Sequence, residues 1–378
     1  MPTLVYLVHG MGCGAAVGDG TPWTADVKLA MTAIQKSFGL AELEWMDAIP
    51  AKAPSGSDAK TWVIPVSYHE AFDQFRAGAL DRAAALKGIT AGVLSDARIA
   101  SLASEPFLWN NCLDVLLWWS DRAQARPQAT VAIDRAIATS DAIARTVKGK
   151  TRRIVIAHSL GTAAATYALR YLAGSGAWRA TGGIDHFVTL ANVAPFLMPE
   201  TEVYGPPLLP GGTRPLVQAF TNARHELDPI PWLLPWRRHD GTNAGTWAST
   251  WALAEANGLA GARTTSGVAA PPGVKPEITH VHGFANYLLA REVAPLIAGM
   301  IRGAYFTPPE LAAIDWPGAW AKFPQLACPN TAAMTQLRGA MATFSSLSPL
   351  GGGRPERGWF ERLLDGAELL MAAKRACP

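Results

Sequence analysis

The sequence contains few charged residues, and the charges of the two signs nearly balance. Charged side chains make up 17% of the 378 residues, and 33 basic residues against 30 acidic ones give a net charge of +3. Consecutive Lys or Arg residues occur in pairs at most. Since nucleic-acid binding calls for a basic surface that neutralises phosphates, the composition gives no reason to expect a nucleic-acid partner.

The sequence also lacks long apolar runs. No segment approaches the roughly 18 apolar residues that a membrane-spanning helix needs, and the most apolar stretch, residues 113–119, is interrupted by Asp114. The N-terminal MPTLVYLVHGMG has no basic segment, and its apolar part is too short for a secretory signal. We therefore predict no transmembrane segment and a cytoplasmic location, although export by a signal-independent route would leave no mark in the sequence.

Cysteine is scarce as well. The four cysteines are Cys13, Cys112, Cys328 and Cys377, and no two of them form a Cys-x-x-Cys pair. A chain of this length can form a core without a disulfide framework. We expect reduced or buried thiols, and a Cys328–Cys377 bridge stays an open alternative.

Apolar residues, at 49% of the chain, are plentiful enough for a large core. They gather in short runs rich in β-branched residues, which suit strands buried on both faces of a parallel sheet. The strand candidates are 3–8, 62–68, 152–157, 186–193 and 216–222. Helical patterns lie between them, at 26–38, within 70–147 and at 160–173. This alternation predicts an α/β fold with a mostly parallel central sheet flanked by helices.

Two segments are too long to be simple connections between these elements. Residues 70–147 hold more than one crossover helix, and residues 230–275 are rich in Pro, Trp, Gly and Thr. Long inserts in compact enzymes often form lids or binding loops, so we interpret both as a cap. We predict one domain over 1–300 that includes these inserts. Residues 301–378 form a mainly helical C-terminal extension packed on it, with a closing amphipathic helix at 356–375.

The strongest motif lies where the strand at 152–157 meets the following helix. The residues there read Ala157-His158-Ser159-Leu160-Gly161, and a helical pattern opens immediately afterwards. A nucleophile elbow needs this strand–turn–helix context, with small residues two positions either side of the serine. Ala157 and Gly161 occupy those two positions. The pattern indicates that Ser159 is a nucleophile.

This AHSLG motif resembles the α/β-hydrolase superfamily, in particular its lipase- and esterase-like members. Ala157 stands where the usual Gly-x-Ser-x-Gly pattern has its first glycine. The resemblance implies the α/β-hydrolase fold, a Ser-acid-His triad in that chain order, and an oxyanion hole. Next to a His9-Gly10 pair such as this one, it implies the backbone N–H groups of Met11 and Leu160 as oxyanion donors, each lowering the barrier by roughly 3–4 kcal/mol.

The acid of the triad is expected after a strand beyond the nucleophile. Asp228, followed by Pro229, comes shortly after the strand candidate at 216–222 and resembles the acid position of lipase-like members. A proline after the acid suits a turn at the end of a strand. Asp228 is our candidate, and Glu226 and Asp240 are its alternatives.

The base is expected nearer the C-terminus, on a loop before a helix. Two histidines, His280 and His282, precede a short helical pattern that contains Asn-Tyr. The family often has its histidine a few residues before such a helix. We therefore assign the base to His282, with His280 as the alternative.

A second cluster of possible metal ligands lies around the acid, comprising His225, Glu226, Asp228, His239 and Asp240. Their spacing does not match the helical His-x-x-x-His pattern of zinc sites. The acyl-transfer chemistry of a serine triad requires no metal. We predict neither a metal nor a cofactor.

Tryptophan is unusually frequent, with 14 residues that include Trp118 and Trp119 in the first insert and Trp232, Trp236, Trp247 and Trp251 in the second. Large aromatic side chains mostly bury area in cores. The alternative is an apolar acyl pocket under a lid, or a surface that meets lipid.

These features together predict a serine hydrolase that cleaves carboxylic esters, with a small-molecule or lipid ester as substrate. Thioesterase, amidase or acyltransferase chemistry on the same fold is an alternative, because a fold does not specify a substrate. A non-catalytic binding module that kept the scaffold is a further one. The acyl and alcohol specificity and the oligomeric state stay open.

Overall fold

The computed structural model describes most of the chain in separate stretches. These are residues 1–10, 24–46, 61–78, 81–90, 94–104, 112–120, 125–146, 150–175, 183–203, 216–224, 228–233, 267–268, 282–289, 293–314, 325–326, 331–346 and 357–376.

A six-stranded sheet lies at the centre of the molecule, and all of its neighbouring strands pair in parallel. Its strands are β1 (Thr3–Val8), β2 (Leu43–Trp45), β3 (Thr61–Val66), β4 (Arg152–His158), β5 (Ile184–Leu190) and β6 (Val217–Ala223). They are ordered β2-β3-β1-β4-β5-β6. The expected α/β architecture with a parallel sheet is thereby confirmed. A separate antiparallel pair joins β7 (Gly267–Val268) to β8 (Gln325–Leu326).

Strand β1 shows why continuous apolar runs form the middle of this sheet. All six of its residues are buried, and successive side chains enter different cores. Leu4 and Tyr6 pack in one core, whereas Val5 and Leu7 pack in the other. Successive side chains of a strand point to opposite faces, so a strand covered on both sides presents apolar side chains to both layers.

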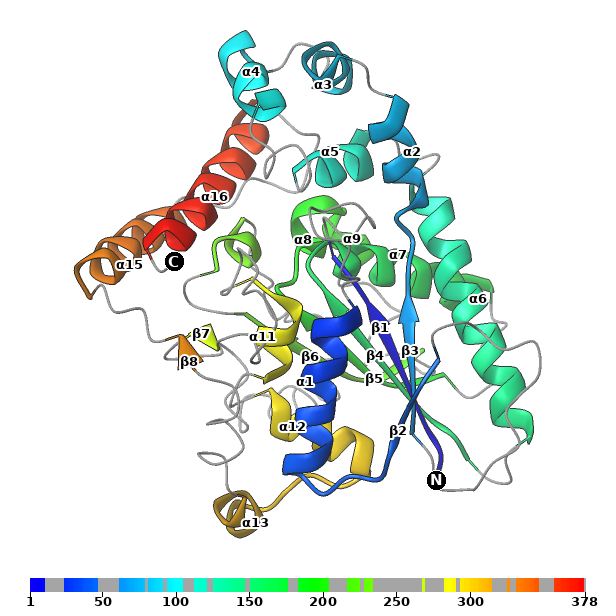
Figure 1. Cartoon of the computed structure of the whole chain (residues 1–378). Coiled ribbons are helices and arrows are strands. Elements are labelled where there is room, and N and C mark those ends of the chain that lie inside the picture. Colours follow the sequence, from blue (N-terminus) through cyan, green and yellow to red (C-terminus); the bar gives the residue numbers. More distant parts are fainter. Residues whose placement is uncertain are drawn as a thin grey trace.

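Helices cover both faces of the sheet (Figure 1). On one face lie α6 (Ala125–Thr146) and α7 (Leu160–Ser175), whose apolar residues pack in the same core as Leu4 and Tyr6 of β1. The other face is covered by α1 (Thr24–Ser37), α11 (Phe284–Leu289) and α12 (Ala294–Arg302). The sheet is therefore the middle layer of three.

The first long insert is helical. It forms α2 (Glu70–Gly78), α3 (Arg82–Thr90), α4 (Asp96–Ser104) and α5 (Leu113–Ser120) before it continues into α6. Trp118 of α5 is fully buried and meets the ring of Tyr167 edge-on at 6.3 Å. For this tryptophan the core interpretation is the one that the structure supports.

The C-terminal residues form α13 (Pro308–Ala313), α15 (Thr331–Ser346) and α16 (Arg357–Ala376). Phe344 of α15 and Leu363 of α16 belong to the same core as α6 and α7. In Figure 1, α16 extends between α15 and α4. The boundary predicted at residue 300 falls inside α12, and the division into two parts stays a prediction.

Two short helices, α8 (Ala194–Leu197) and α9 (Glu200–Val203), follow β5, and a 3-10 turn, η3 (Ile230–Trp232), follows β6. None of the helices within the described stretches combines the length and the apolar character that crossing a membrane requires.

Candidate active site

The candidate site lies where the order of the parallel strands reverses. From β1 the chain adds β3 and β2 on one side, and β4, β5 and β6 on the other. A sheet of this kind leaves a crevice at the carboxyl ends of the two strands at the reversal, and ligands bind there. His9 and Gly10 directly follow β1, and Ser159 directly follows β4. The motifs singled out in the sequence therefore meet at this point.

Ser159 sits on a sharp turn between β4 and α7. Its φ is 53°, in the left-handed region that a residue with a side chain rarely adopts. Hydrogen bonds hold the turn in place: the Ser159 N–H donates to Leu190 O at 2.9 Å, and the Thr162 hydroxyl donates to Ser159 O at 2.6 Å. The strained backbone is thus anchored to the neighbouring strand β5.

Glycine is required beside this turn because the chain segments approach very closely. A Cβ atom on Gly161 would lie 2.3 Å from the carbonyl oxygen of His9. A Cβ atom on Gly10 would lie 2.5 Å from the Cβ of Ser159. The end of β1 therefore runs directly beside Ser159.

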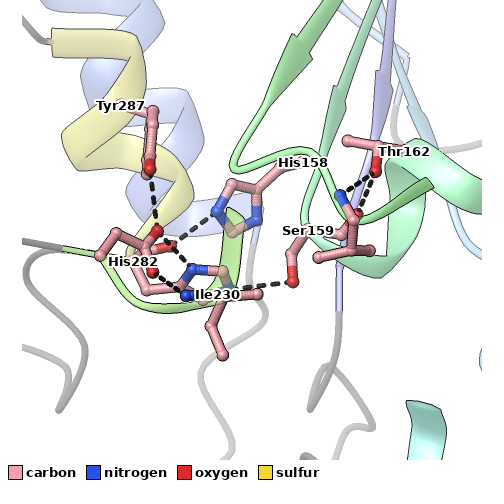
Figure 2. A network of polar contacts seen from close by, with 8 residues as sticks. His158, Ser159, Thr162, Ile230, His282 and Tyr287 are labelled. Carbon is pink, nitrogen blue, oxygen red and sulfur yellow. Dashed lines mark hydrogen bonds and ion pairs between the residues drawn. The ribbon is translucent and has the colours of Figure 1, made fainter. Parts of the chain in front are cut away.

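Three polar side chains form a hydrogen-bonded series at this turn (Figure 2). His282 Nε2 lies 2.8 Å from Ser159 Oγ, and His282 Nδ1 lies 2.7 Å from Asp228 Oδ2. A carboxylate can only accept, so Nδ1 carries a hydrogen, and in the neutral imidazole Nε2 then presents its lone pair to the serine hydroxyl. This is the tautomer that a general base for Ser159 requires.

The Asp228 carboxylate is fully buried, and three donors surround it. Its Oδ1 accepts the Ile230 N–H at 3.0 Å. Its Oδ2 accepts both His282 Nδ1 and the Tyr287 hydroxyl, the latter at 2.8 Å. A buried charge is tolerated when hydrogen bonds replace its lost hydration. The turn after β6, His282 and helix α11 each supply one of those bonds.

His158, the residue before Ser159, holds the loop that carries His282. Its Nε2–H donates to the His282 carbonyl oxygen at 2.6 Å, and its ring stacks on Phe284 at a centroid distance of 5.0 Å. Burial lowers the pKa of His158 well below its usual value, and the charges that His282 and His9 can carry lower it further. His158 is therefore neutral, and its hydrogen bond joins the end of β4 to the loop that carries His282.

The expected oxyanion donors are described only in part. Leu160 is the first residue of α7, and the first four N–H groups of a helix have no acceptor within it. Met11 lies outside the described residues. On the β1 side, the Tyr68 hydroxyl donates to His9 O at 2.8 Å and so fixes the end of the strand next to Gly10.

Several other predicted residues also lie outside the described part of the chain. They are His225, Glu226, His239, Asp240 and His280, the cysteines Cys13, Cys328 and Cys377, and the tryptophans Trp236, Trp247 and Trp251. Within the described stretches, no group of three or more His, Cys, Asp or Glu side chains is placed to hold a metal ion. Burial raises the pKa of the Cys112 thiol to about 12, so this cysteine stays protonated and is not a competing nucleophile.

Comparisons of the chain with family models, with curated proteins and with solved structures find no match. Only the geometry of the site therefore bears on function.

The sequence predicts no chemical role for two residues of this network. Tyr287 belongs to the Asn-Tyr pair after the two candidate histidines, and His158, beside Ser159, is assigned no chemistry. A tyrosine five positions after the candidate base was a visible signal. The hydrogen bond between this tyrosine and Asp228 was not visible in the sequence, because the two residues are 59 positions apart.

Proposed function

We propose that this protein is a serine hydrolase of the α/β-hydrolase type that cleaves carboxylic esters through an acyl-enzyme on Ser159. The observation that carries the proposal is the series from Ser159 Oγ through His282 to Asp228, at the reversal point of a parallel sheet. The three residues come from the ends of different elements, yet they meet with both hydrogen bonds below 3 Å. A hydroxyl, an imidazole and a carboxylate in this order activate a serine for acyl transfer.

In the first half of the reaction, Ser159 Oγ attacks the ester carbonyl while His282 Nε2 takes the hydroxyl proton. Asp228 stabilises the resulting imidazolium through Nδ1. The oxyanion of the tetrahedral intermediate faces the start of α7, where the Leu160 N–H is one expected donor and Met11 the other. His282 then returns the proton to the leaving alcohol as the C–O bond breaks.

In the second half, a water molecule takes the place of the alcohol. His282 removes a proton from the water, the hydroxide attacks the acyl carbonyl, and the carboxylic acid leaves as Ser159 regains its hydrogen. Each proton that His282 takes up during the cycle is released again before the cycle ends. No step requires a cofactor or a metal.

Hydrolysis of a p-nitrophenyl ester series, from acetate to palmitate, tests this proposal. Ser159→Ala is expected to lower kcat by a factor on the order of 10⁴–10⁶. Ser101→Ala, which removes an exposed hydroxyl from α4, is the matched control and should keep full activity. Turnover by Ser159→Ala close to that of the wild type would contradict the proposal, and the best substrate length would measure the acyl pocket.

A further inference from the structure

Tyr287 places a buried hydroxyl on the same carboxylate oxygen that binds His282. The two donors lie 2.8 and 2.7 Å from Asp228 Oδ2. The ring of Tyr287 packs with the apolar residues of α1 and α12, where the ring of a phenylalanine would bury equally well. The ring also meets that of His158 at a centroid distance of 5.8 Å, and the acceptor of the hydroxyl is the acid of the candidate triad.

The contacts of Asp228 fix the plane of its carboxylate. The Ile230 N–H holds Oδ1, and Tyr287 holds Oδ2 from α11. With both oxygens held by groups other than the imidazole, the carboxylate cannot rotate away from His282 Nδ1. The Tyr287 hydroxyl and the His282 ring therefore meet at one oxygen of this group.

We propose that Tyr287 is a positioning residue, whose hydroxyl holds the Asp228 carboxylate in line with His282 and shares the charge of Oδ2 with it. The proposal deepens the proposed function and rests on it. Tyr287 and His282 are carried by one short segment, because α11 begins two residues after His282. The base and the group that orients its acid therefore move together.

Tyr287→Phe tests this role, since it removes the hydroxyl and keeps the ring. With an active ester substrate we expect kcat to fall about tenfold, the usual scale for a hydrogen bond to a charged group, while KM stays within about twofold. Tyr305→Phe is the matched control. Its partly buried phenol lies near Arg152, at the opposite end of β4 from Ser159, and its removal should leave both constants unchanged.

A second readout does not depend on turnover. The proton on His282 Nδ1 is held by a carboxylate, and such protons resonate far downfield in one-dimensional proton NMR. The signal is assigned by its loss in His282→Ala. In Tyr287→Phe the Oδ2 charge is left to the imidazole N–H alone, so that hydrogen bond strengthens and the resonance moves further downfield.

The two readouts separate the two proposals. A wild type that hydrolyses no ester would contradict the proposed function, yet a displaced resonance in Tyr287→Phe would still support the positioning role. A resonance at the same position in both proteins would overturn the role of Tyr287, whatever the activity. An unchanged kcat in an active Tyr287→Phe enzyme would overturn it as well.

Discussion

At the scale of single residues, the site depends on how closely three chain segments approach one another. Ser159 adopts a left-handed backbone that costs of the order of 1–3 kcal/mol, and the surrounding hydrogen bonds keep it there. Gly161 allows the first turn of α7 to touch the carbonyl groups at the end of β1. Strain and close approach thus occur together at the proposed nucleophile.

Gly161→Ala is expected to destabilise the protein by about 3 kcal/mol and to abolish activity, because its Cβ would lie 2.3 and 2.6 Å from the carbonyl oxygens of His9 and Val8. The neighbouring backbone cannot yield without moving the end of β1 away from Ser159. Gly174→Ala in the same helix is the control. A Cβ there meets nothing within 4 Å, so the change should be less than about 1 kcal/mol. Urea denaturation of both variants measures the difference, and equal stabilities would contradict this explanation.

At the scale of elements, α16 connects the segment after Asp228 with the helical insert. Arg362 donates to Trp232 O at 3.1 Å, and Gly366 lies against Leu233. On the insert side, Arg98 of α4 pairs with Glu368 at 2.6 Å and with Asp365 at 3.3 Å. The helix therefore combines an apolar contact near the site with exposed ion pairs at the insert.

We expect apolar burial to hold α16 in place more strongly than its ion pairs do. Leu363 is 2% exposed, and its truncation to alanine is expected to cost about 2–5 kcal/mol through lost burial and the cavity left behind. Arg98→Ala removes two ion pairs whose partners are about half exposed, and solvent screening limits that loss to roughly 1 kcal/mol. Thermal unfolding of the two variants ranks them. A larger loss of stability in Arg98→Ala than in Leu363→Ala would mean that the ion pairs contribute more than the apolar burial.

The sequence predicts five of the six strands of the central sheet. A sheet covered by helices on both faces needs apolar strands, and such strands are visible in the sequence as short runs rich in β-branched residues. Strand β2 was not predicted, because its three residues are too few to show an apolar run. The end of β5 was predicted at residue 193, but the strand stops at Leu190 because Ala191 turns the chain with a φ of 49°. No apolar pattern encodes such a turn.

The candidate site was predictable where each residue has a motif beside it. Ser159 has its elbow, Asp228 its proline and His282 its short helix. The roles of Tyr287 and His158 were not predictable, since each is a hydrogen bond between segments far apart in the sequence. Such contacts emerge only when the elements pack.

At the scale of the whole molecule, buried histidines link stability to pH. Burial lowers the pKa of His9 to about 3 and that of His186 to about 4, and it lowers the pKa of His158 well below its usual value. In the unfolded chain each imidazole takes up a proton as the pH falls below 6.5. In the folded protein these imidazoles stay neutral until the pH reaches their lowered pKa values. The unfolded state therefore binds more protons, and acid favours it.

We therefore expect the free energy of unfolding to decrease as the pH falls from about 7 toward 4, by up to about 1.4 kcal/mol per pH unit for each buried histidine. His186→Gln removes one such group at a distance from the candidate site, and its slope should be shallower by up to that amount. Chemical denaturation at several pH values measures both slopes. A wild-type stability that is flat across this range would contradict the account.

Covalent labelling with a fluorophosphonate probe shows whether Ser159 is an activated nucleophile. Such probes react with a serine whose hydroxyl is deprotonated by a neighbouring base. We predict that mass spectrometry of the labelled protein places one adduct on Ser159, and that His282→Ala abolishes the labelling while the protein stays folded. Absence of an adduct on the folded wild type, or an adduct on another residue, would contradict the claim.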